Sequence, residues 1–271
     1  MMQSVRRWLI SAGAVAAAAA AVCGQAVPPA QAAPGDAAAS VTAATYVPPS
    51  HDLFYGDTGS AVRSVQNRLS QLHYYPGPID GVYGPDMEQA VWAFKEVQGL
   101  PMNAYSNSVV TWAFRKALVH PRLPKVLVKN GGAERIEINQ SIEVLVLYKS
   151  DKVHLILHVS TGGNCLVDQG CGWITPDGDY TALSFLPGWV QVPLGEMYNP
   201  VFFIGTAYAI HGDIPVPWFP DSHGCVRIWM DAATWFHTEL TVGGSHATPV
   251  YIRGTAPYSS LANLGAVFTG A

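Results

Sequence analysis

Cys225 lies in a segment whose residue types could support covalent catalysis. The segment reads DSHGCVRIW, with His223 two residues before the cysteine, and His211 lies near the end of the earlier stretch AYAIHG. A thiol becomes a strong nucleophile when a neighbouring base takes its proton, and imidazole is the usual base. Gly224 permits a tight turn that could direct successive backbone N–H groups at one point, as an oxyanion hole requires. These residues together predict acyl transfer.

Two other interpretations of the same residues remain open at this point. A lone buried cysteine is more often a small core residue than a nucleophile. His211, His223 and Cys225 could also bind zinc, with Asp213 or Asp221 as a fourth ligand.

The amino-terminal residues have the three-part pattern of a secretory signal peptide. Arg6 and Arg7 precede an apolar stretch from Leu9 to Val22, and Ala30-Gln31-Ala32 offers a cleavage site. The alternative is a membrane anchor, but the stretch is short for a span and poor in Leu and Ile. We therefore expect cleavage after residue 32, a secreted protein of the cell wall or periplasmic space, and no stable membrane span after cleavage.

The cysteine count bears on the same site. Removal of Cys23 with the signal peptide would leave Cys165, Cys171 and Cys225, which allow three pairings. Cys165 and Cys171 lie six residues apart in a glycine-containing loop that can fold back, and a bridge between them would contribute roughly 2 kcal/mol on the chain-entropy model. That disulfide would leave Cys225 as a free thiol.

Composition excludes several classes of protein. The 271-residue chain has a formal net charge of −4, with 15 Lys and Arg against 19 Asp and Glu, so a basic nucleic-acid-binding protein is not expected. Eight Trp, 12 Tyr and nine Phe can build hydrophobic cores, so a disordered chain is not expected either. The length predicts about two domains.

Residues 53–118 have the periodicity of helices. A first helix follows Asp57 and Ser60, both good N-cap residues, and a second runs from Pro85 to the residue before Gly99. A third is suggested near Trp112. The apolar positions of these helices are Val62, Val65, Leu69 and Leu72; Ala90, Val91, Phe94 and Val97; and Val109, Trp112 and Ala113.

Residues 125–254 have the patterns of strands. The predicted strands are RIEIN at 135–139, EVLVLY at 143–148, KVHLILHVS at 152–160, VFFIG and AYAIHG at 201–212, and PVYIR at 249–253, with one helix from Asp231 to about Leu240. His154 and His158 alternate with an apolar strand face and are expected at solvated positions. The predicted fold is α+β and multidomain, a small three-helix bundle followed by a mostly antiparallel β-sandwich.

The predicted boundaries follow from these patterns. They are a signal peptide at 1–32, a flexible leader at 33–52, a helical domain at 53–118, a Pro-containing linker at 119–124, a sheet domain at 125–254 and a tail at 255–271.

The segment from Ile210 to Arg227 resembles the signature of the L,D-transpeptidase (YkuD-like) catalytic domain. That signature is His-Gly, a spacer, and Ser/Thr-His-Gly-Cys followed by an apolar residue and Asn or Arg, here IHG and SHGCVR. HVSTGG at 158–163 and LGEMYNPVFF at 194–203 are also similar to segments of the family. The nine-residue spacer is short for the family.

The resemblance implies a role for each residue of the signature. Cys225 would be the nucleophile and His211 its general base, with the Gly212 backbone orienting the ring. Backbone N–H groups of His223, Gly224 and Cys225 would form the oxyanion hole, and Ser222 would help to shape the turn. The expected substrate-binding residues are Arg227, Tyr198 and Trp218, although Trp218 fits a place in the core equally well.

The resemblance also implies an acyltransferase of peptidoglycan biosynthesis, cell wall organisation and cell shape. Its acyl donor would be a stem tetrapeptide, which loses the terminal D-Ala as two third-position residues are cross-linked. No cofactor or metal is expected, and carbapenem-type compounds are expected to acylate Cys225. Faster attack by water would make an L,D-carboxypeptidase, and a non-catalytic wall-binding scaffold is the remaining alternative.

Residues 53–100 resemble the three-helix peptidoglycan-binding domain. The GDTG opening, the Val-x-x-x-Gln-x-x-Leu helix and the IDGVYGP loop carry the resemblance, whereas His73, Lys95 and the region of Asn103 depart from it. The resemblance implies that this domain binds glycan and holds the enzyme on its polymeric substrate.

Overall fold

The computed structural model of the protein describes residues 46–166 and 170–257, and it describes only the backbone of residues 164–166 and 170–172. The predicted signal peptide, most of the leader and most of the tail lie outside the described residues. Helices and strands follow the predicted order, three helices and then a sheet domain with little helix. The predicted fold class is confirmed.

The helical domain consists of α1 (Ser60–Gln71), α2 (Pro85–Gln98) and α3 (Trp112–Val119). The N-cap of α1 is Gly59, without a side-chain hydrogen bond, so the predicted capping by Asp57 or Ser60 is wrong. Asp57 instead accepts a hydrogen bond from the backbone N–H of Phe54. The Gly99 C-cap of α2 adopts the left-handed conformation that commonly ends helices.

His73, Lys95 and Asn103 depart from the pattern of the three-helix domain, and the structure shows what each does locally. His73 has a φ of +69°, a backbone conformation that suits glycine better than a branched side chain. Lys95 is buried and donates hydrogen bonds to the carbonyls of Ser106 and Asn107. The Asn103 side chain accepts hydrogen bonds from the backbone N–H groups two and three residues later. Lys95 and Asn103 therefore stabilise the loop before α3 in a way that the pattern did not predict.

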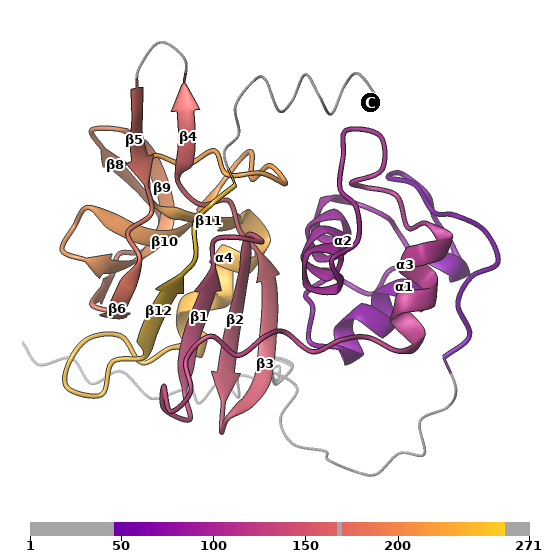
Figure 1. The fold of residues 1–271 in the computed structure, drawn as a ribbon, viewed down its shortest axis with the longest axis horizontal. Helices are drawn as coiled ribbons and strands as arrows, with labels where there is room; N and C mark the ends of the chain where they lie inside the picture. The colour runs from indigo at the N-terminus through magenta and orange to yellow at the C-terminus, as the bar shows by residue number, and fades with distance from the viewer. Residues whose placement is uncertain (1–45, 167–169, 258–271) are drawn as a thin grey trace, which may run out of the picture. The chain divides into compact units, whose positions relative to one another are not determined.

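The sheet domain holds two larger sheets and a two-stranded hairpin. One sheet has the order β3-β2-β1-β12-β6, and the other has the order β11-β10-β9-β7, with β8 paired to β9 (Figure 1). Most pairs are antiparallel, but β1 and β12 are parallel, as are β10 and β11. The strands are β1 (Arg135–Asn139), β2 (Val144–Lys149), β3 (Lys152–His158), β4 (Gly163–Leu166), β5 (Gly170–Ile174), β6 (Gly178–Thr181), β7 (Ser184–Phe185), β8 (Trp189–Val192), β9 (Gly195–Ile204), β10 (Tyr208–Asp213), β11 (Val226–Trp229) and β12 (Pro249–Arg253).

The predicted helix after the nucleophile segment is present in two parts. The α-helix α4 (Met230–Trp235) continues directly into a 3₁₀ helix, η1 (Phe236–Glu239). Ala232, Ala233 and Phe236 pack into the core between the two larger sheets.

Both faces of the β2–β3 hairpin are buried, and each face belongs to a different core. Leu145 and Leu147 of β2 pack in the core between the sheets, whereas Val146 and Tyr148 pack in the core of the helical domain. This explains why residues 143–148 form a continuous apolar run, because a strand that is buried on both faces does not alternate. The helical domain and the outer face of the first sheet therefore share one hydrophobic core.

The same packing overturns one prediction from the sequence. His158 is only 2% exposed, because α2 covers the face of β3 that the alternation had assigned to solvent. The prediction of a solvated His158 is therefore wrong. His154 is more accessible and contacts the Glu239 carboxylate at 3.0 Å.

The hairpin of β4 and β5 contains the two cysteines of the predicted disulfide. Its backbone register places Cys165 opposite Cys171. The two side chains lie outside the described residues, so the disulfide stays a prediction. No helix within 46–166 or 170–257 is long and apolar enough to cross a membrane.

Candidate active site

The parallel pair β10 and β11 positions the predicted catalytic residues. Ile210, Val226 and Ile228 point into the core between the sheets. Because side chains alternate along a strand, the intervening residues point to the opposite face. His211 on β10 is paired in register with Arg227 on β11, and Cys225 immediately precedes β11. This alternation brings His211, Cys225 and Arg227 to one side of the sheet.

These residues open onto a cavity of about 550 Å³. That volume lies in the range of small-molecule and peptide sites. Among the described residues its lining comes from the β8–β9 hairpin, the β9–β10 turn, the two parallel strands and the turn before Cys225. The lining residues are Trp189, Val192, Pro193, Leu194, Gly195, Glu196, Met197, Thr206, Ala207, His211, Asp213, Ile214, Ser222, His223, Cys225 and Arg227.

A tight turn that requires glycine presents Cys225. Gly224 has a φ of +116°, and a Cβ atom at this position would lie 2.6 Å from the ring of Tyr208 and 3.1 Å from the carbonyl oxygen of Ile174. Both the backbone conformation and the lack of space exclude a larger residue. The structure therefore accounts for glycine directly before the thiol.

Ser222 closes this turn with two hydrogen bonds. Its hydroxyl donates to the carbonyl oxygen of Cys225 at 2.6 Å and accepts from the backbone N–H of Gly224 at 3.0 Å. The Gly224 N–H, one of the three expected oxyanion donors, is therefore already engaged. The N–H groups of His223 and Cys225 have no described protein acceptor.

Ser160 and Thr161, which follow β3, form hydrogen bonds with residues on both sides of Cys225. The backbone N–H of Ser222 donates to the Thr161 carbonyl at 3.1 Å, and Ser160 exchanges two backbone hydrogen bonds with Arg227. The buried carboxylate of Glu143 accepts hydrogen bonds from both the N–H and the hydroxyl of Thr161. Burial raises the pKa of Glu143 to about 8.

The His211 ring has a defined orientation. Its Nδ1 lies 2.9 Å from the carbonyl oxygen of Gly212. Since a carbonyl can only accept, Nδ1 carries the proton and the neutral ring keeps a lone pair on Nε2. Burial lowers the pKa of His211 below its ordinary value. The ring is thus a neutral base over most of the physiological pH range.

The Cys225 thiol is also neutral in this environment. Burial raises the pKa of Cys225, and a hydrogen bond from the Ala209 backbone and the nearby Arg227 guanidinium only partly oppose this effect. Sγ lies 3.9 Å from Sδ of Met197 and 3.8 Å from the carbonyl oxygen of Ala207. Within the described part of the chain, no hydrogen bond joins Sγ to the His211 ring.

Arg227 is paired with carboxylates beside the site. Its Nε lies 2.8 Å from Asp213 and its Nη1 lies 3.5 Å from Asp221. Asp213 and Asp221 are the two alternative fourth ligands of the zinc hypothesis. The described residues contain no group of three His, Cys, Asp or Glu side chains arranged to hold a metal ion.

Comparison with known proteins identifies the family. The L,D-transpeptidase catalytic domain model matches residues 133–252, and the peptidoglycan binding domain model matches residues 58–108. The chain is 30% identical to an L,D-transpeptidase from Xylanimonas cellulosilytica whose crystal structure covers residues 123–326, with a TM-score of 0.65 over 76% of this chain and 100% of that one. This chain belongs to the L,D-transpeptidase family.

A second L,D-transpeptidase structure, from Stackebrandtia nassauensis, is 16% identical, with a TM-score of 0.45 over 78% of this chain and 99% of that one. No curated protein sequence matches the chain.

The remaining predicted residues of this L,D-transpeptidase lie around the cavity in different ways. His223 lines it with an exposed side chain, and its ring packs edge-on against Trp173 at 5.2 Å. Tyr198 and Trp218 are absent from the lining. Tyr198 packs against Trp189 at 5.3 Å, and Trp218 packs against Phe219 at 5.5 Å. Contact of Tyr198 or Trp218 with substrate stays a prediction.

The apolar wall of the transpeptidase cavity was not predicted from the sequence. Trp189, Leu194 and Ile214 are each more than half exposed and line it, and Glu196 adds a carboxylate. One sequence signal could have indicated this wall. In the run WVQVPLGEM at 189–197, apolar residues lie on both sides of a Pro-Leu-Gly turn, and turns lie at the surface.

Proposed function

We propose that this L,D-transpeptidase uses Cys225 as its nucleophile and His211 as its general base on peptidoglycan stem tetrapeptides. The observation that carries the proposal is the orientation of His211. Its Nδ1–H is held by the Gly212 carbonyl, which leaves Nε2 as the basic nitrogen, and His211 and Cys225 line the same cavity. A neutral imidazole base and a neutral thiol in one cavity suit nucleophilic acyl transfer.

In the first half of the reaction, Nε2 of His211 takes the Sγ proton while sulfur attacks the carbonyl carbon of the third residue of the stem. The carbon–nitrogen bond to the terminal D-Ala then breaks, and the imidazolium donates its proton to the leaving amine. The products are free D-Ala and a thioester on Cys225. Backbone N–H groups of His223 and Cys225 would stabilise the oxyanion, because neither has a described acceptor.

In the second half, the side-chain amine of a third-position residue on another stem attacks the thioester. His211 takes a proton from that amine, the carbon–sulfur bond breaks, and the proton returns to sulfur. The product is an amide between two third-position residues and a regenerated thiol. His211 therefore serves both halves of the cycle.

The remaining parts of the proposal concern location and partners. We propose that the protein acts outside the cytoplasmic membrane, which the amino-terminal signal pattern and the location of its substrate both support. The helical domain would hold glycan, and its match to the peptidoglycan binding domain model supports this role. No cofactor takes part in the proposed cycle.

The same thiol should react with carbapenem-type compounds. Sulfur would attack the β-lactam carbonyl, the carbon–nitrogen bond of the ring would open, and the nitrogen would take the proton. Because no group leaves, the protein would gain the whole mass of the compound.

The test uses residues 33–271 and the Cys225→Ala variant with a disaccharide-tetrapeptide, read by mass spectrometry. A cross-linked dimer that has lost D-Ala, and that Cys225→Ala does not form, is the expected result. Tripeptide without dimer, in the presence of excess acceptor, would favour the L,D-carboxypeptidase. Absence of product and of any adduct on Cys225 would contradict the enzyme and favour the wall-binding scaffold.

A further inference from the structure

The segment of residues 214–220, which joins the strand of His211 to the turn of Cys225, is held in part by the helical domain. Val216 in this segment is buried, and its carbonyl accepts a hydrogen bond from the Gln89 side chain of α2 at 3.2 Å. The next carbonyl, that of Pro217, lies 2.9 Å from Nε2 of His158. Two successive residues of the segment are thus fixed by groups outside it.

His158 in turn depends on α2. Its Nδ1 lies 2.8 Å and 3.0 Å from the two carboxylate oxygens of Glu96, and its ring packs edge-on against Trp92 at 5.3 Å. Since the Pro217 carbonyl can only accept, Nε2 of His158 must carry a proton. Nδ1 can then donate to the Glu96 carboxylate or accept from its acid form, and either arrangement keeps the ring in place.

The contacts come from one face of α2. Gln89, Trp92 and Glu96 are spaced by three and four residues, so their side chains lie on the same side of the helix. Asp86, one turn earlier, lines the same small cavity as Trp229 at the end of β11. This face therefore touches the elements on both sides of the nucleophile turn.

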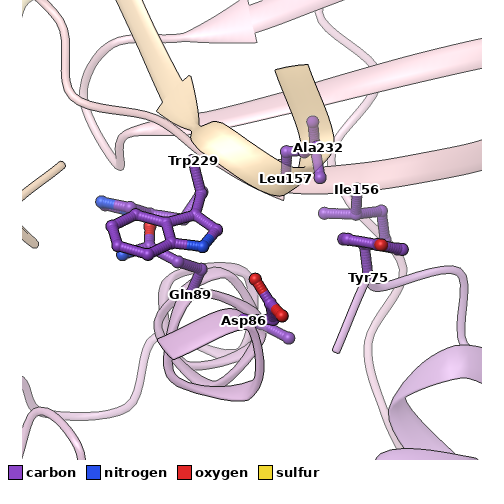
Figure 2. A pocket seen from close by; sticks show the side chains of 9 residues that line it. Tyr75, Asp86, Gln89, Ile156, Leu157, Trp229 and Ala232 are labelled. Atoms are coloured by element: carbon purple, nitrogen blue, oxygen red, sulfur yellow. The ribbon is translucent and has the colours of Figure 1, made fainter. Parts of the chain in front are cut away.

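The interface is closely packed rather than a ligand site. The cavity between α2, β3 and α4 has a volume of only about 10 Å³, room for no more than a single water. Figure 2 shows Asp86 and Gln89 of α2 facing Trp229, with Ile156, Leu157 and Ala232 nearby. Movement of α2 would accordingly be transmitted to the residues that it contacts.

We infer that Glu96 and Gln89 of the helical domain are positioning residues for the transpeptidase reaction, because Gln89 directly and Glu96 through His158 hold the 214–220 segment that connects His211 to the turn of Cys225. This inference rests on the proposed roles of those two catalytic residues. It differs from the expectation that the helical domain only holds the enzyme on its substrate. The domain would also contribute to the turnover of a small soluble substrate that needs no attachment to the wall.

The test compares four variants of the full secreted chain, Glu96→Ala, Glu96→Gln, Gln89→Ala and Lys95→Met. Lys95→Met is the matched control, because this buried charge is next to Glu96 and, among the described residues, donates hydrogen bonds to the carbonyls of Ser106 and Asn107 in its own domain. Two quantities are measured with soluble disaccharide-tetrapeptide and acceptor, kcat and KM. Amide hydrogen exchange is measured over residues 216–225, where the amides of Asp221, Ser222 and Gly224 are hydrogen-bonded.

We expect Glu96→Ala and Gln89→Ala to lower kcat by about tenfold or more with KM little changed, and to raise exchange in 216–225 by a similar factor. Glu96→Gln should keep both kcat and the exchange in 216–225 near wild type, because the glutamine amide can donate a hydrogen bond to Nδ1 of His158. Lys95→Met should lower the melting temperature yet leave kcat and this exchange near wild type.

Unchanged exchange and unchanged kcat in Glu96→Ala would overturn the inference. So would an equal loss of kcat in Lys95→Met at a matched loss of melting temperature. A wild-type protein without Cys225-dependent turnover would instead contradict the proposed function, and the exchange measurement would still decide whether α2 holds the segment.

Discussion

The guanidinium of Arg227 lies 2.8 Å from the carboxylate of Asp213, and this ion pair joins the two strands that carry His211 and Cys225. The two charges have opposite effects on the base, because Asp213 raises the pKa of His211 and Arg227 lowers it. Burial, the largest influence, lowers that pKa below its ordinary value. The two members of the pair therefore oppose each other in their effect on the pKa of His211.

The first prediction concerns the acidic limb of the profile of kcat/KM against pH. In the wild type the midpoint of this limb should lie at a pH below the ordinary histidine pKa of about 6.5, because burial lowers the pKa of His211. Arg227→Gln should move the limb to higher pH and Asp213→Asn to lower pH, each by about half to one pH unit. Shifts in the same direction for both variants would contradict the assignment of His211 as the base.

A second prediction follows from the raised pKa of the Cys225 thiol. Alkylation of this residue by iodoacetamide should accelerate roughly tenfold for each pH unit from pH 6 to pH 9, since only the thiolate reacts. Peptide mapping would follow Cys225 by itself, with Cys225→Ala as the blank. A plateau that extends below pH 7 would indicate a preformed thiolate–imidazolium pair, contrary to the structure.

Gly224 and Gly244 provide a third, matched comparison. Both have a positive φ, but a Cβ atom would meet the Tyr208 ring at residue 224 and nothing within 4 Å at residue 244. Gly244→Ala should cost about 1–2 kcal/mol of unfolding free energy and leave kcat unaltered. Gly224→Ala should cost more and lower kcat by about 100-fold, because the turn that presents the thiol must move. Equal kcat in the two variants would refute the steric argument.

The fourth prediction tests the hydroxyl that closes the nucleophile turn. Ser222→Ala removes hydrogen bonds to the Gly224 N–H and to the Cys225 carbonyl, both in a buried setting. We expect a loss of about 1–3 kcal/mol in unfolding free energy and about a tenfold fall in kcat. Ser222→Thr keeps the hydroxyl and should retain most of the activity. If Ala and Thr behave alike, the hydroxyl has no part in shaping the turn.

A fifth prediction concerns the β4–β5 hairpin. The register that places Cys165 opposite Cys171 is compatible with the bridge that their spacing predicts. Peptide mapping without reductant should recover the two cysteines in one linked peptide and Cys225 alone. Full alkylation of Cys165 and Cys171 before reduction would show that no bridge exists.

Much of the site could be predicted because its determinants are local. The alternation at Ile210 and His211 orients β10, and the hydrogen bonds within the Ser-His-Gly-Cys turn join residues at most three positions apart. The three helices and the strands β1, β2, β3, β9, β10 and β12 were predicted from periodicity for the same reason, whereas β4 to β8 and β11 were not predicted. Sequence similarity then supplied the family, which the match to the Xylanimonas cellulosilytica structure confirmed.

The errors arose where distant segments decide the outcome. His158 alternates with apolar neighbours as a solvated residue would, yet α2, about 60 positions away in the chain, supplies Glu96 and buries it. The parallel pairing of β1 with β12 likewise joins the two ends of the sheet domain, and no local pattern indicates it. The apolar wall at Trp189 and Leu194 was missed because exposed apolar residues have no fixed spacing.

The core that the helical domain shares with the first sheet has a consequence for how such proteins can be dissected. Val146 and Tyr148 of β2 pack with Phe94 and Phe114 of the helices. A protein shortened to begin after residue 124 would lack the helices, would expose that apolar sheet face to water and would favour self-association. The border between the two matched families is thus not a border between two folding units. A chimera that joins this catalytic domain to a foreign wall-binding module should stay monomeric only if the newcomer brings a complementary apolar surface.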